Sequence, residues 1–100
     1  MREGVRILCV GDETTLLRIR CEVLRQAGYS SQTATIAEAE DILTNQAFDL
    51  VIVSAFLRET DQQRVLSAAG ETPTLVLQGI AIPRELLAAV EAKLPSANAW

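Results

Sequence analysis

The sequence predicts a single α/β domain in which helices cover both faces of a parallel sheet. Three observations support this fold class. The 100 residues are enough for one hydrophobic core. Short apolar segments alternate along the chain with longer segments whose apolar residues recur at helical spacing. The segment Leu50–Val53 is apolar without alternation, as in strands that are buried on both faces.

The amino-terminal part predicts a strand followed by a helix. The strand is expected at Val5–Val10, which is apolar and rich in β-branched residues. The helix is expected at Thr14–Ala27, and Gly28 supplies the left-handed residue favoured just after a helix end. Its predicted core-facing stripe comprises Leu16, Leu17, Ile19, Val23, Leu24 and Ala27.

The next strand and helix carry more polar residues. Tyr29–Thr33 is too polar for a central strand, so we expect it at an edge of the sheet. Thr35 and Glu38 have the spacing of a capping box, which predicts a helix from Ile36 to about Gln46. We interpret three acids of this helix as a solvated face: Glu38, Glu40 and Asp41.

The carboxyl-terminal half continues the alternation. Asp49–Val53 predicts a central strand, and a helix of about Asp61–Ala69 is expected after a loop. Thr74–Gln78 predicts a fourth strand, and Pro83 suits the first turn of a last helix. The apolar residues of that helix recur at helical spacing: Leu86, Leu87, Val90 and Leu94.

Right-handed crossovers fold such a βαβαβαβα chain into a doubly wound sheet. We expect one domain over residues 1–95 and a loose tail over residues 96–100. In these sheets a functional site is expected beyond the carboxyl ends of the strands. The residues that follow or end those strands are Asp12, Glu13, Ser54 and Gln78.

Composition excludes several classes of function. The chain has no histidine, which removes the commonest general base and metal ligand, so we do not expect an enzyme. A net charge of -4 without a run of Lys or Arg argues against nucleic acid as a partner. No apolar run approaches the length of a membrane span, and no signal-peptide pattern precedes the first strand, so we expect a cytoplasmic protein. We interpret Cys9 and Cys21 as buried, reduced thiols.

Three segments resemble a response-regulator receiver domain: Ile7–Glu13, Leu24–Tyr29 and Phe48–Val53. The resemblance implies a flavodoxin-like fold with strand order 2-1-3-4 and a role in two-component signal transduction. Receivers take a phosphoryl group from a histidine kinase onto an aspartate at the end of the third strand. Acidic residues after the first strand hold a divalent metal, and a Thr or Ser and a Lys after later strands complete the switch.

The chain departs from the receiver pattern at the residues that carry phosphotransfer. Ser54 stands in the place of the phospho-accepting aspartate, and Gln78 in that of the switch hydroxyl. The usual acidic pair is Gly11-Asp12, followed by Glu13. Two carboxylates without a third anionic ligand make a weak Mg²⁺ site, so we interpret Asp12 and Glu13 as vestigial and expect no cofactor. The structural alternative for Asp12 is a cap of the following helix. We expect a degenerate receiver that is not phosphorylated and acts as a protein-interaction module.

The chain is also shorter than a receiver. Between residue 79 and Pro83 there is no counterpart of the family's fourth helix and fifth strand with its Lys; alternatively, Thr74–Leu77 corresponds to the fifth strand and the fourth is lost. Either loss leaves the last strand at an edge and uncovers apolar surface on one face of the last two strands. The predicted contact residues are Thr74, Leu75, Val76, Leu77 and Gln78.

We expect a homodimer formed at this surface by edge pairing, by packing of the uncovered faces or by exchange of the last helix. In the alternative arrangement the last helix covers the surface and the protein is a monomer. A second hypothesis for the function is a small-ligand or metal sensor that uses a pocket at the strand ends, near Asp12, Ser54 and Gln78.

Overall fold

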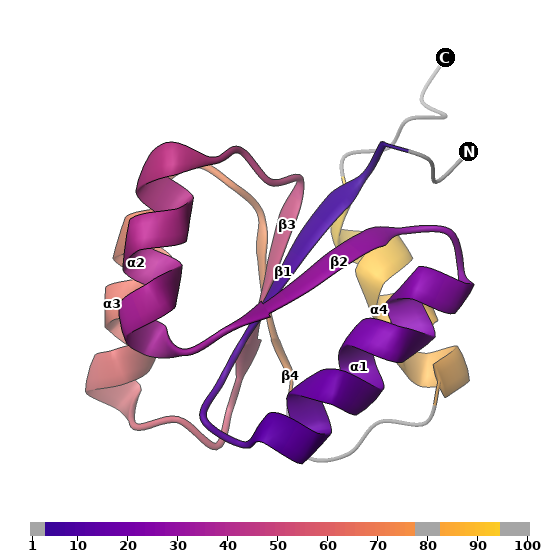
Figure 1. Ribbon diagram of the computed structural model, residues 1–100, viewed down its shortest axis with the longest axis horizontal. Coiled ribbons are helices and arrows are strands. Elements are labelled where there is room, and N and C mark those ends of the chain that lie inside the picture. Colours follow the sequence, from indigo (N-terminus) through magenta and orange to yellow (C-terminus); the bar gives the residue numbers. More distant parts are fainter. Residues whose placement is uncertain (1–3, 78–82, 95–100) are drawn as a thin grey trace.

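In residues 4–77 and 83–94, which the computed structural model describes, four strands alternate with four helices (Figure 1). The strands are β1 (Arg6–Val10), β2 (Ser30–Ala34), β3 (Leu50–Ser54) and β4 (Thr74–Leu77). The helices are α1 (Thr14–Gln26), α2 (Ile36–Asn45), α3 (Glu59–Ala69) and α4 (Pro83–Lys93). Each element was predicted from the sequence. Gln78 and the predicted tail over residues 96–100 lie outside the described residues.

The strands form one parallel sheet in the order β2-β1-β3-β4, as predicted. Cys9 in β1 is paired with Thr33 in β2 on one side and with Ile52 in β3 on the other. β1 and β3 are therefore central, while the polar strand β2 lies at an edge, as its sequence indicated. β4 pairs with β3, with Val76 opposite Val53. In the described part of the chain no strand lies beyond β4.

Two helical layers enclose the sheet, with α1 and α4 on one face and α2 and α3 on the other (Figure 1). Successive residues of a strand point to opposite faces. Ile7 and Cys9 of β1 therefore pack with α1 and α4, while Leu8 and Val10 pack with α2 and α3. Since each face has its own core, β1 and β3 need apolar residues toward both faces, and this explains the lack of alternation in residues 7–10 and 50–53.

Helix α1 buries a stripe that differs in part from the one predicted. Ile19, which was expected to face the core, is 49% exposed, whereas Arg20 is buried. Leu16, Leu17, Cys21 and Leu24 are buried as expected. At about 100° per residue, the buried residues of α1 occupy one side of the helix, and Arg20 lies within about 30° of the centre of that side. Ile19 lies about 130° from the same centre and therefore faces solvent.

Helix α3 begins two residues earlier than the sequence indicated. The Gln62 amide donates to the Arg58 carbonyl over 2.9 Å, so the first turn already includes Glu59 and Thr60. The Arg58 side chain makes no capping hydrogen bond, which is why no capping residue marked this start in the sequence. The helix ends at Ala69, and the next residue, Gly70, has a φ of 61°, a left-handed value that glycine adopts without strain.

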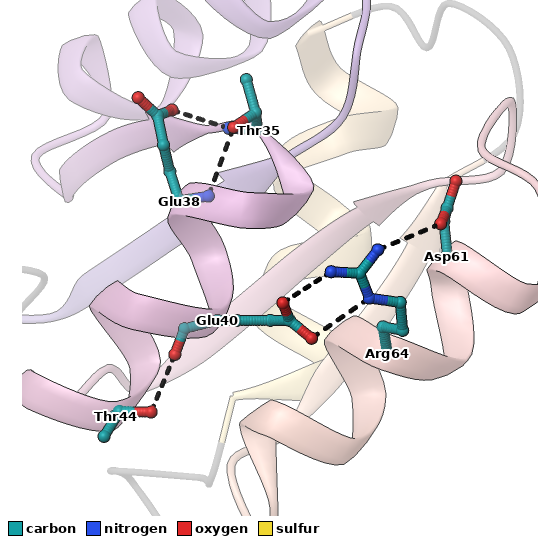
Figure 2. A network of polar contacts seen from close by, with 6 residues as sticks. All are labelled: Thr35, Glu38, Glu40, Thr44, Asp61 and Arg64. Carbon is teal, nitrogen blue, oxygen red and sulfur yellow. Dashed lines mark hydrogen bonds and ion pairs between the residues drawn. The ribbon is translucent and has the colours of Figure 1, made fainter.

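Helices α2 and α3 are joined by a charged contact that the sequence did not reveal (Figure 2). Arg64 of α3 donates to both carboxylate oxygens of Glu40 in α2, with Nη2–Oε1 2.7 Å and Nε–Oε2 3.2 Å. The hydrogen bond from Arg64 holds the pKa of Glu40 below its ordinary value. Both side chains are well exposed, as expected for a solvated face, and the pairing of Glu40 with Arg64 is what the sequence did not indicate. An ion pair this exposed adds little to stability.

The predicted capping box opens α2 (Figure 2). The Glu38 amide donates to Thr35 Oγ1 over 3.3 Å, and the Thr35 amide donates to Glu38 Oε1 over 2.9 Å. Replacing Thr35 by Ala removes one partner, and we expect a loss of about 1 kcal/mol in the free energy of unfolding. Urea denaturation followed by circular dichroism measures this loss.

Thr44→Ala is the matched control, because Thr44 lies in the same helix and its hydroxyl donates only to the Glu40 carbonyl one turn earlier. We expect its free energy of unfolding to stay within about 0.5 kcal/mol of the wild type. Equal losses in the two variants would show that the capping box does not stabilise α2.

Candidate functional site

The residues singled out by the sequence lie at the carboxyl edge of the sheet. Gly11 and Asp12 directly follow β1, and Ser54 is the last residue of β3. Since β1 and β3 are paired neighbours, these residues come together in the fold. The placement of Gln78, the fourth residue predicted for the site, lies outside the described residues.

Ser54 is a buried residue whose hydroxyl is already bonded. Its side chain is 2% exposed, and Oγ accepts a hydrogen bond from the Phe56 amide over 3.3 Å. The loop that follows is held by Gln62, whose side-chain amide donates to the Leu57 carbonyl over 2.8 Å and to the Ala55 carbonyl over 3.3 Å. The hydroxyl therefore stabilises a turn. The chain has no histidine to activate it as a nucleophile.

Gly11 packs tightly against Ser54. A Cβ atom at Gly11 would lie 3.2 Å from the Cβ of Ser54 and 3.2 Å from Cδ2 of Leu17. Such distances are shorter than ordinary van der Waals contacts, so any side chain at residue 11 would have to displace its neighbours. Backbone and apolar atoms thus fill the space between the ends of β1 and β3.

Of the two acids after β1, Glu13 and not Asp12 has the role of capping the following helix. Asp12 and Glu13 are both exposed. Glu13 is the N-cap of α1, where its Oε1 accepts from the Thr15 amide over 3.3 Å. In residues 4–77 and 83–94, no three Cys, Asp or Glu side chains converge as a metal site would require. The weak Mg²⁺ site predicted for Asp12 and Glu13 stays a prediction.

A buried polar group under α1 was missed by sequence reasoning. Arg20 lies near Cys9 of β1, and Cys9 Sγ is 3.8 Å from the hydroxyl of Ser31 in β2. Burial raises the pKa of Cys9 to about 12 and lowers that of Arg20. The signal was present, since Arg20 follows Leu17 by three residues in the buried stripe. A buried thiol with a raised pKa is unreactive at neutral pH.

The exposed side of α1 carries an open groove. Its described lining consists of Thr15, Arg18, Ile19 and Glu22, which follow one another at helical spacing. The groove therefore lies on α1. Ile19 supplies its apolar surface. The pocket predicted near Asp12, Ser54 and Gln78 includes a residue outside the described ones and stays a prediction.

The predicted contact strand β4 is only partly uncovered. Leu77 is buried, Thr74 and Leu75 are half-buried, and Val76 is 40% exposed on the face that carries α2 and α3. The apolar residues of β3 are fully buried, so the prediction that the last two strands would both be uncovered is wrong for β3. Helix α3 covers β3, and this cover does not extend over Val76.

Solved structures with the same fold identify the family. A CheY-like response regulator receiver domain from Methanospirillum hungatei JF-1 superposes with a TM-score of 0.64 and 20% identity, over 88% of this chain and 91% of that one. The non-phosphorylated HemR receiver domain of Leptospira biflexa gives a TM-score of 0.61 and 31% identity, over 88% of this chain and 75% of that one. The chain belongs to the response-regulator receiver family. A response regulator of Burkholderia multivorans is also 31% identical, with a TM-score of 0.52 over 91% of this chain and 78% of that one.

The assignment to the receiver family thus rests on solved structures. No protein-family model matches the chain, and no curated protein matches it. Within the described residues, no helix has the length and apolar character that crossing a bilayer requires. Receiver domains serve two-component signalling, and this coarse role follows from the family.

The burial of both cysteines leads to a test of the native packing. Cys9 and Cys21 are free and buried. We expect a thiol-specific reagent at neutral pH to label neither residue in the folded receiver and both in denaturant, because reaction requires an accessible thiolate. Intact mass spectrometry counts the labels. Fast labelling of the folded protein would contradict the packing of β1 against α1.

The contact between Gly11 and Ser54 leads to a second test. We expect Gly11→Ala to lower the free energy of unfolding by about 1–3 kcal/mol, as overpacking of a filled core does. Leu17→Ala removes one of the two atoms in the way, so the same glycine substitution should cost less in that background. Denaturation of the four proteins in this cycle measures the coupling. If the losses in the free energy of unfolding caused by Gly11→Ala and Leu17→Ala simply add in the double variant, the contact between residues 11 and 17 is not the source of the strain.

Proposed function

We propose that this receiver domain is not phosphorylated and acts as a protein-interaction module in two-component signal transduction. The observation that supports it most directly is the state of Ser54: the residue at the end of β3 is a neutral hydroxyl, buried and bonded to the Phe56 amide. A serine in this position cannot form the acyl phosphate that the family makes on an aspartate.

The surroundings of Ser54 support the same proposal. Phosphoryl transfer needs a metal or other cations to offset charge on the transferring group. Gly11 contributes no carboxylate next to Ser54, and Glu13 caps α1. The single lysine of the chain, Lys93, lies in the last turn of α4. We therefore expect neither a bound cofactor nor an enzymatic activity. As a separate expectation, we place the protein in the cytoplasm.

We propose that the partner of the domain includes a second copy of itself. β4 pairs with β3 on one side, and α4 packs on the face of α1 through Leu86 and Val90. Helix α4 therefore leaves Val76, on the opposite face, exposed. An unpaired strand edge beside exposed apolar surface is a site of association.

The alternative hypothesis of a ligand sensor at the strand ends has less support. Such a sensor needs an accessible hollow near Asp12 and Ser54, and Ser54 is buried. The described groove lies on α1. Thermal shift in the presence of Mg²⁺, phosphate and nucleotides separates the hypotheses, because a ligand that binds the native state raises its melting temperature.

The lack of phosphorylation is tested with a small-molecule phosphodonor and Mg²⁺. We expect the intact mass of this receiver to stay unchanged, because β3 ends in Ser54 and not in a carboxylate, and because no three acidic or thiol side chains converge among the described residues. A receiver that carries the aspartate serves as positive control and should gain the mass of one phosphoryl group. The same gain in this protein would overturn the proposal, and peptide mapping would locate the acceptor.

A further inference from the structure

We propose that two copies of the receiver join through the β4 edges, which pair antiparallel about a two-fold axis at Leu75. This inference rests on the homodimer proposed above and names its contact. It extends the four-stranded sheet of each copy into one continuous sheet, and it selects edge pairing over face packing and over exchange of α4.

The backbone of β4 presents its free hydrogen-bonding groups at two residues. The Val51 amide donates to the Pro73 carbonyl and the Ala55 amide to the Leu77 carbonyl, so residues 73 and 77 face β3. Backbone groups alternate in direction along a strand, and Leu75 therefore faces β3 as well. The N–H and C=O groups of Thr74 and Val76 point away from the sheet. Among the described residues, no group bonds to them.

These outward groups determine the register. If Thr74 lies opposite Val76 of the second copy, each pair exchanges two hydrogen bonds, and all outward groups of the described strand are used. Leu75 then meets Leu75 of the second copy on the axis. Pairing Thr74 with itself would instead place Val76 opposite Thr72, whose amide already donates to the Ala69 carbonyl over 3.0 Å. One acceptor of each Val76 would then lack a donor.

The side chains of β4 suit contact with an identical strand. The segment 72–77 carries no charge, so pairing it with itself brings no like charges together, although the chain has a net charge of -4. Val76 would lie against Thr74 of the second copy on the face of α3. Leu66 of α3 is half-buried and is not part of the core on either face of the sheet. It lies about 200° around the helix axis from Arg64, which contacts α2, and so it is on the side of α3 away from α2.

The opposite edge of the sheet shows how this fold protects a strand. Ser30 donates to the Val5 carbonyl and Gly11 to the Ala34 carbonyl, so the Ser31 carbonyl points away from β1 at the β2 edge. The Arg25 side chain covers it, with Nε and Nη2 each 3.3 Å from that oxygen. A charged side chain at an edge discourages pairing with another chain. The described residues provide no such cover for β4, so β4 and not β2 is the edge that pairs.

Cysteine cross-linking tests the register at known spacing. Residue 75 of the two copies would form a non-hydrogen-bonded pair with Cα atoms about 4.5 Å apart, within reach of a disulfide. Residue 76 of the two copies would be about 8–9 Å apart, beyond reach. After oxidation, we expect Leu75→Cys to form a disulfide-linked dimer, and we expect the yield of this dimer to be at least tenfold lower for Val76→Cys. The wild type is the control for the buried Cys9 and Cys21.

Sedimentation of the wild type at micromolar concentrations separates the possible failures. A dimer mass together with cross-linking at residue 75 supports the proposed pairing. A dimer mass with no cross-link, or with stronger cross-linking at residue 76, would overturn the pairing and leave the homodimer standing. A monomer mass at every concentration would overturn both, and a partner strand from another protein would then be the occupant of this edge.

A pair of substitutions at Val76 gives an independent measurement. Val76→Pro removes an amide that points away from β3, so the folded sheet tolerates it, whereas Val76→Ala keeps the amide and removes the same apolar contact. Edge pairing predicts a dissociation constant at least tenfold higher for the proline variant than for the alanine variant. If both variants have the circular dichroism spectrum of the native protein and their dissociation constants are equal, the copies pack through side chains, and the proposal is contradicted.

Discussion

The burial of β3 on both of its faces is the constraint on which the rest of this receiver depends. Leu50, Val51, Ile52 and Val53 are fully buried, and their side chains point alternately to opposite sides of the sheet. Two helical layers are needed to keep them from water, at a gain of about 1.5–3 kcal/mol for each buried side chain. The pairing of α1 with α4 and of α2 with α3 follows from this need, because each pair closes one of the two cores (Figure 1).

The same close packing extends to the carboxyl edge of the sheet, where a doubly wound fold ordinarily keeps its chemistry. Gly11, Leu17 and Ser54 fill the space between the ends of β1 and β3. A phosphorylation site needs room for carboxylates, a cation and water at this edge, whereas apolar and backbone atoms meet here. The proposed lack of phosphotransfer therefore agrees with the close packing at this edge.

The edges of the sheet differ because different side chains flank them. At β2, Arg25 from α1 bonds to the Ser31 carbonyl and places a charge beside the edge. At β4, the neighbouring helix α4 turns its buried residues Leu86 and Val90 toward the face shared with α1, and Val76 stays exposed on the other face. One end of the sheet is thus closed by a side chain, and the other offers hydrogen-bonding groups and apolar surface in the same place.

The sequence alone determined the order and type of the eight elements in the described residues, since unbroken apolar strands, the Thr35–Glu38 capping box and the glycines after helices are local signals. Only the tertiary structure decided which residues at the border of the apolar stripe of α1 are buried, with Arg20 inside and Ile19 outside. The spacing of apolar residues does not fix this border, because it depends on how the neighbouring elements pack against the helix. It also decided the pairing of Glu40 with Arg64, which are 24 residues apart, and the contact of Gly11 with Ser54. Such contacts depend on how elements pack, and no spacing along the chain encodes them.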